Sequence, residues 1–267
     1  MISTLPQHEP VDLERSPIVL ALVQLQFPAI LSIKTDEKMV ARYQDRVRER
    51  YPYFFVGQQV EFLLGPQGVA QQPAQASNWQ FKDIEQNWTI TITTNAVTLE
   101  TRRYTSISDF VDRMAEAVLA AKEVFGITVQ QRVGLRYVNE IRHSEVEKPS
   151  DWRQFMNLAL LGPLSDDAVA DSIESTAQEL RLTTSDGSLI LRHGATRGTT
   201  VALEPGTVAP EGEFYLLDID AFNEEGRELD VRALGELVKS YNSTIYSLFR
   251  WSMNDQLFEH LRSGEDD

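Results

Sequence analysis

Two carboxylates lie two positions apart in a segment with the composition of a β-strand. Asp218 and Asp220 alternate with the apolar Leu217 and Ile219, and side chains two apart on a strand share one face about 7 Å apart. Carboxylate oxygens are the ligands that Mg²⁺ and Mn²⁺ prefer. The pair therefore predicts a metal site, which would suit an enzyme acting on a phosphate ester or a nucleotide. The alternative is an acidic strand face in solvent, with a turn beginning at Asp220.

A second polar strand face lies within residues 132–140. Arg132, Gly134 and Arg136 share that face. The planar guanidinium of arginine matches a phosphate or carboxylate group, and the missing side chain at Gly134 would let a ligand or another strand approach. We favour the alternative that Arg136 pairs across the sheet with Asp218 or Asp220, because acidic residues are in surplus. Such a pair would organise the fold without performing chemistry.

A basic stripe recurs every four residues along the first predicted helix. In an acidic protein it could dock an acidic protein surface, including another copy of this chain, or contact nucleic acid. Acidic neighbours at Asp45 and Glu49 neutralise part of it, so we favour a solvated helix face. The stripe consists of Lys34, Lys38, Arg42, Arg46 and Arg50.

The helices and strands that would position these residues can be read from the sequence pattern. Together they indicate an α+β fold, with long helices packed on one face of one or more antiparallel sheets. Apolar periodicity indicates helices over residues 36–51, 107–125 and 230–251, and a helix or loop over 152–161. Residues 65–78, rich in Gly, Pro, Gln and Ala, are predicted to form a surface loop. Strands are expected over residues 18–27, 79–84, 88–94, 97–103, 128–142, 172–183, 188–193 and 213–220.

We expect one compact unit over residues 1–267, with mobile ends at 1–15 and 263–267. Both halves of the chain, 16–143 and 150–260, read as antiparallel strands followed by a long helix. An internal duplication into two β-β-(β)-α halves is therefore an open alternative.

Composition removes several classes of function. The chain has no cysteine, which excludes disulfides, thiolate metal sites and cysteine nucleophiles. The four histidines show no metal-ligand spacing, and there is no phosphate loop, nucleophile elbow or dinucleotide-binding glycine motif. The first residues do not resemble a signal peptide, and the longest apolar stretch, 18–23, is far below a membrane span. We expect a cytoplasmic protein with no membrane contact.

The net charge of −15 is concentrated in one part of the chain. Residues 166–230 hold 15 acidic residues and four arginines, a net charge of −11. An acidic surface repels phosphate backbones and anionic headgroups, which argues against nucleic acid and membranes as partners. The charge would suit a basic protein partner or a bound cation. The plainer interpretation is that it serves solubility.

Four segments carry a resemblance to a known group of proteins. They are Ser16-Pro17-Ile18, the TRRYTSISDF segment with Thr101 and Tyr104, GLRYVN at 134–139 and LDIDAF at 217–222. Together they resemble a sporadically distributed bacterial family of about 260 residues without a known function. The resemblance implies no reaction, cofactor or ligand. A patchy distribution is typical of phage-defence and toxin–antitoxin cargo.

Our leading hypothesis is a non-enzymatic binding or scaffold protein that needs no cofactor and acts through a protein partner or as a homo-oligomer. The first alternative is a Mg²⁺- or Mn²⁺-dependent enzyme with Asp218 and Asp220 as ligands and Arg136 as the anion clamp. The second is a nucleic-acid-binding accessory protein that uses the basic stripe.

Overall fold

A nine-stranded antiparallel sheet forms the centre of the molecule. A computed structural model describes residues 2, 5–65, 68–200 and 210–264, with the backbone alone for 58–65 and 68–77. The strand order is β2-β3-β4-β5-β1-β7-β10-β9-β8. In that order the strands are β2 (Tyr53–Gly65), β3 (Gly68–Lys82), β4 (Trp88–Ile92), β5 (Ala96–Thr101), β1 (Ile18–Gln26), β7 (Arg132–Ile141), β10 (Glu213–Asn223), β9 (Gly187–Arg197) and β8 (Gln178–Thr184).

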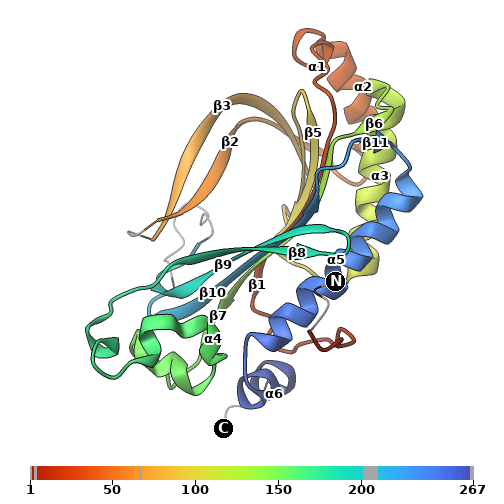
Figure 1. The fold of residues 1–267 in the computed structure, drawn as a ribbon. Helices are drawn as coiled ribbons and strands as arrows, with labels where there is room; N and C mark the ends of the chain where they lie inside the picture. Colours follow the sequence, from red (N-terminus) through yellow and green to blue (C-terminus); the bar gives the residue numbers. More distant parts are fainter. Residues whose placement is uncertain (1, 3–4, 66–67, 201–209, 265–267) are drawn as a thin grey trace.

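Helices cover one face of this sheet, and the β2–β3 hairpin arches over the opposite side (Figure 1). We call these the covered face and the arch face. The predicted α+β class, an antiparallel sheet with packed helices, is confirmed. The helices are α1 (Ser32–Thr35), α2 (Glu37–Val47), α3 (Ile107–Phe125), α4 (Leu158–Leu161), α5 (Val231–Trp251) and α6 (Asp255–Ser263), and a small separate sheet pairs β6 (Val129–Gln130) with β11 (Arg227–Glu228).

Local capping sets the ends of the two long helices. The Ser106 side chain accepts a hydrogen bond from the backbone N–H of Asp109 at the start of α3. Gly126 ends that helix with φ 70°, a left-handed conformation that glycine adopts without steric cost. Asp230 caps α5 by accepting from two backbone N–H groups. Helix α3 therefore occupies the residues that apolar spacing predicts.

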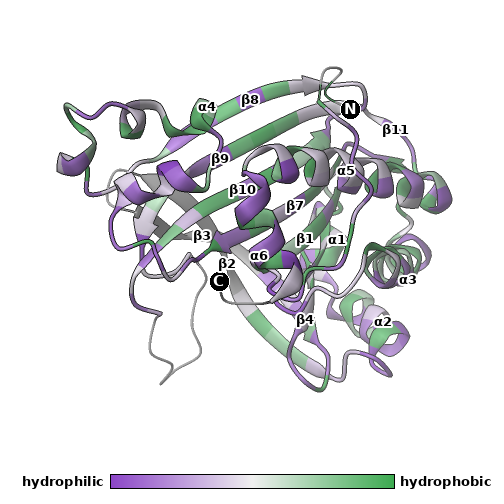
Figure 2. Ribbon diagram, turned by 90° about the horizontal axis from the view of Figure 1, so that it is seen from below, coloured by the Kyte–Doolittle hydropathy of each residue, from purple (hydrophilic) through white to green (hydrophobic). Residues whose placement is uncertain are grey.

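The main core lies between the covered face and the helices. Odd-numbered residues of β7 and β10, such as Leu135, Leu217 and Ile219, are fully buried there. They pack in one cluster with the inner faces of α3 and α5, whereas Figure 2 shows hydrophilic residues on the outward sides of α5 and α6. Burial of these apolar stripes is the main force that holds the helices on the sheet.

The loop predicted at 65–78 is wrong for the residues that the structure describes. Residues 68–78 belong to β3, whose backbone pairs with β2 from Gly65↔Gly68 through Val60↔Pro73 to Tyr53↔Lys82. Neighbouring strands are joined by hydrogen bonds between backbone groups. Pairing with β2 can therefore form a strand here although the side chains have low strand propensity. Residues 66 and 67 lie outside the described part.

Other boundaries shift for similar tertiary reasons. The strand expected over 128–142 is interrupted at Gln131, whose backbone N–H donates to the Gln26 carbonyl. The strand expected from 172 begins only at Gln178, after a 3₁₀ turn at Ala170–Ser172. Residues 152–161 form two short helical pieces, Pro149–Gln154 and α4. Helix α6 was not predicted. The sequence also predicts a loop over residues 204–212, which contain Pro and Gly, and residues 204–209 of it lie outside the described part.

Both halves of the chain contribute strands to the same sheet, since β8, β9 and β10 continue it beyond β7. Part of the N-terminal arm that we predicted to be mobile is tied to the body. Glu14 and Arg15 donate backbone hydrogen bonds to the carbonyls of Arg262 and Leu261, and the Val11 N–H donates to the Tyr246 hydroxyl. Across the described residues, no helix has the length and apolar character needed to cross a membrane.

Candidate functional site

Asp218 and Arg136 form a bidentate ion pair on the arch face. Arg136 Nε and Nη2 donate to the two carboxylate oxygens over 2.6 and 2.7 Å. Arg192 on β9 lies 3.5 Å from the same carboxylate and itself binds Glu179 on β8 at 2.8 Å. Charges of alternating sign therefore run across four adjacent strands, because diagonal and directly opposed positions of an antiparallel sheet share a face.

Asp220 has a separate partner on the same face. Arg132 Nη2 donates to its carboxylate over 3.0 Å. To reach it, Arg132 passes over Gly134, where an added Cβ would lie 2.7 Å from the Arg132 guanidinium. Gly134 thus makes room for a neighbouring side chain. Burial raises the pKa of Asp220, although the arginines Arg132 and Arg136 act to lower it.

The four predicted site residues on β7 and β10 are therefore brought together as ion pairs. Both oxygens of Asp218, which is only 3% exposed, accept hydrogen bonds from arginine. No group of three metal-binding side chains occurs within residues 5–65, 68–200 and 210–264. The metal interpretation stays a prediction, and the geometry favours charge pairing. With Arg192 and Glu179 the network holds three cations and three anions.

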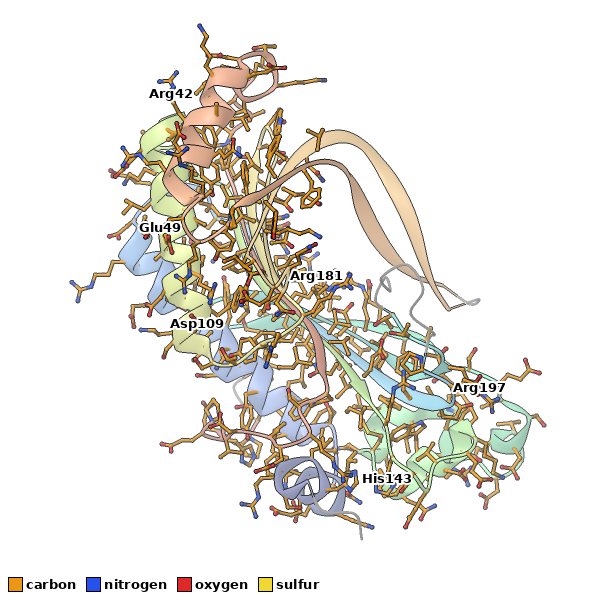
Figure 3. All side chains as sticks on the ribbon, turned by 180° about the vertical axis from the view of Figure 1, so that it is seen from behind. Arg42, Glu49, Asp109, His143, Arg181 and Arg197 are labelled. Carbon is orange, nitrogen blue, oxygen red and sulfur yellow. The ribbon has the colours of Figure 1, made fainter. Side chains whose placement is uncertain are left out.

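The basic stripe is divided by the packing of α2 on α3. Arg46 pairs with Glu123, and Arg50 pairs with both Asp109 and Glu116. These contacts join the two helices. In the first part of the stripe no acidic partner contacts Lys34, Lys38 or Arg42 among the described residues, and Arg42 points away from the body of the molecule (Figure 3).

A cavity of about 520 Å³ lies between the N-terminal arm, the start of α3, β7 and α5. We call it the arm cavity. Tyr137 on β7 lies within hydrogen-bond distance of the Tyr104 hydroxyl at 3.2 Å and of Asn242 Oδ1 at 2.9 Å. Burial raises the pKa of both Tyr104 and Tyr137. The tyrosines are therefore neutral hydrogen-bonding groups and not bases at physiological pH.

A second cavity, of about 500 Å³, contains more ionisable side chains. His143 and His260 face each other there with ring centroids 4.5 Å apart, and His260 Nε2 lies 3.0 Å from Arg15 Nη1. Two of the four histidines, which show no metal-ligand spacing in the sequence, are therefore neighbours in the fold. The residues are 117 positions apart, so spacing carries no signal. His143 lies beside α6 at the lower end of the molecule in Figure 3.

The outer edge of the sheet carries an apolar run. Tyr53, Phe54 and Phe55 on β2 are 41% to 44% exposed, and Val56 is 67% exposed. β2 is the first strand of the sheet and pairs only with β3 among the described residues. An exposed edge segment without charged side chains, such as Tyr53 to Val56, offers free backbone groups for pairing with another chain.

Comparison with protein-family models and with curated proteins found no match for this chain. Its function must therefore be inferred from the geometry described above.

Proposed function

We propose that the protein is a binding protein without enzymatic activity, and that it acts through self-association along the outer edge of β2. The observation that supports this function is the run of four exposed apolar residues on that edge. Edge strands normally carry charges, prolines or covering elements that prevent such pairing. In Figure 1 the hairpin arches away from the helices.

The distribution of charge favours a second copy of this chain as the partner at the β2 edge. The chain carries a net charge of −15, so two copies repel over most of their surfaces. From Tyr53 to Val60 the sequence has no side chain that is charged at neutral pH. Two β2 strands can pair antiparallel about a twofold axis and bring the same patch of each copy together. The contact then avoids the acidic surface.

The opposite edge of the sheet, strand β8, can be compared with β2. β8 also exposes an apolar residue, Leu180 at 41%. Its neighbours Glu179 and Arg181 are charged, and the strand has seven residues against 13 in β2. A short, charged edge is protected against pairing, whereas β2 has an uncharged stretch from Tyr53 to Val60 before its one acidic residue, Glu61. We therefore assign association to β2 alone.

Sedimentation equilibrium of matched edge variants tests the function. We expect a concentration-dependent dimer of the wild-type chain, and we expect Val56→Lys to weaken it at least tenfold because the twofold axis brings two new charges together. Leu180→Lys, the same change on the opposite edge, should leave the dimer unchanged. A wild-type chain that stays monomeric at high micromolar concentration, or equal loss in both variants, would contradict the proposal.

A further inference from the structure

The arm cavity contains four neutral polar side chains whose hydrogen-bonding capacity is only partly used. Asn139 Nδ2 donates to the carbonyl of Leu217 over 2.9 Å. A carbonyl can only accept, so this contact fixes the orientation of the amide. The Oδ1 of Asn139 is left as an acceptor without a partner in the described part of the chain. Asn139 is 3% exposed overall, and its Oδ1 is not among the fully buried polar atoms that lack a partner, so it keeps contact with the open space of the cavity.

Asn242 on α5 supplies the complementary donor. Its Oδ1 faces the Tyr137 hydroxyl, and its Nδ2 has no partner among residues 5–65, 68–200 and 210–264. The hydroxyl of Tyr246 accepts from the Val11 N–H and has no acceptor for its own hydrogen within the same residues. The Tyr104 hydroxyl contacts only Tyr137 in the described part of the chain. Donors and acceptors therefore both line the cavity.

The charge of the lining selects against anions. Among the described lining residues Asp12 is the one charged side chain, and no lysine, arginine or histidine is present. A phosphate or carboxylate would enter without a compensating cation, which is costly in a partly buried site. The second cavity, which contains Arg15, Arg142 and two histidines, differs in this respect.

The remaining walls suit a flat apolar body. Ile18, Ile107, Ile245 and Phe249 line the cavity beside the rings of the tyrosines. Aromatic walls bind planar rings by stacking or edge contacts. The volume of about 520 Å³ lies within the range of small-molecule sites, roughly 300–1,000 Å³.

We propose that the arm cavity binds a small uncharged heterocyclic molecule with neighbouring N–H and C=O groups, of the size of a nucleobase or nucleoside. Asn139 Oδ1 accepts from the ligand, and Asn242 Nδ2 and the tyrosine hydroxyls bind its polar edge. The arm, tied down by the contact between Val11 and Tyr246, forms one wall. This site is separate from the β2 edge, so the inference does not depend on self-association.

Calorimetry and saturation-transfer NMR with uridine and adenosine as probes test this site. We expect at least one nucleoside to bind the full chain, and its 5′-monophosphate to bind at least tenfold more weakly because the lining offers no cation. Asn242→Leu should weaken the nucleoside roughly tenfold or more, as expected for a lost pair of buried hydrogen bonds. Asn139→Leu should do the same.

Controls separate ligand loss from misfolding. Ser243→Leu adds the same side chain one position along α5, outside the lining residues, and should leave affinity unchanged. Thermal unfolding shows whether each variant folds, and two asparagine variants are used because Asn139 also binds the β10 backbone. The proposal is overturned if neither nucleoside binds at millimolar concentration, if the monophosphate binds as well as the nucleoside, or if folded Asn242→Leu retains wild-type affinity.

Discussion

The two faces of the nine-stranded sheet bury titratable groups in different ways. Arg192 and His193 are neighbours on β9 and therefore point to opposite faces. On the arch face, Arg192 lies between Asp218 and Glu179 and forms an ion pair with each. On the covered face, His193 contacts the Tyr215 hydroxyl at 2.9 Å, and burial lowers its pKa to about 4.

This difference shows two solutions to the same desolvation cost. A group buried near an opposite charge stays ionised, because the attraction offsets the loss of hydration. A group buried among apolar neighbours becomes neutral, as its shifted pKa reports. Burial likewise raises the pKa of Tyr215 beside His193. Around His193 and Tyr215 the covered face is therefore neutral, whereas the arch face is a charge-balanced network. At the end of β9 and β10 the covered face also buries Glu213, which pairs with Arg197.

The largest effect is expected from truncation on the covered face. Leu217 is fully buried in the main core, and Leu217→Ala should lower the free energy of unfolding by about 2–5 kcal/mol, because it removes apolar contacts and leaves a cavity. Denaturation in urea measures this loss. Leu158→Ala, at an exposed leucine, is the control and should have little effect. Equal effects at both sites would contradict the assignment of the core.

Removal of one charge from the arch-face network should have the next largest effect. Asp218→Ala leaves Arg136 without its bidentate partner, and we expect a loss of about 2–3 kcal/mol, below the range for fully buried pairs since Arg136 keeps some solvent contact. Urea denaturation again measures the change.

A double variant distinguishes pairing from packing at this position. Arg136→Met with Asp218→Leu removes both charges and should recover most of the stability lost in Asp218→Ala. Glu236→Ala breaks an exposed pair with Lys239 and should cost much less. If the double variant is less stable than Asp218→Ala, the network contributes more than charge balance.

The smallest of the three effects is a pH dependence from His193. Its pKa is about 4 in the folded protein against the usual 6.5. Between these values the unfolded chain takes up a proton that the folded protein excludes, so this contribution to stability is complete above pH 6.5 and is lost as the pH falls towards 4. Between pH 7.5 and pH 5 the loss should be about 2 kcal/mol.

Comparison of histidine variants isolates this contribution. Unfolding free energies at the two pH values should differ less for His193→Gln than for the wild type, by about the same 2 kcal/mol. His8→Gln, on the exposed arm, should keep the wild-type pH dependence. An unchanged pH dependence in His193→Gln would mean that His193 is not neutral in the folded protein.

Local signals in the sequence were sufficient for the elements with strong periodicity and clear caps. Helix α3 begins after Ser106 and ends before Gly126, as predicted, because capping and apolar spacing act within a few residues. The alternation of side chains along a strand also predicted which residues of β7 and β10 share a face. Pairing of Arg136 with an acidic residue across the sheet was anticipated, since only a charged partner makes a buried arginine tolerable.

Tertiary contacts alone decided the rest. The long β2–β3 hairpin forms through backbone pairing that composition does not encode. The arm cavity joins Asn139 and Asn242, and the second cavity joins His143 and His260, across more than 100 residues of sequence in each case. Periodicity and capping act over a few residues, so the sequence by itself determined the elements and their apolar faces. Sites built from distant segments depend on strand order and helix packing, which only the folded chain establishes.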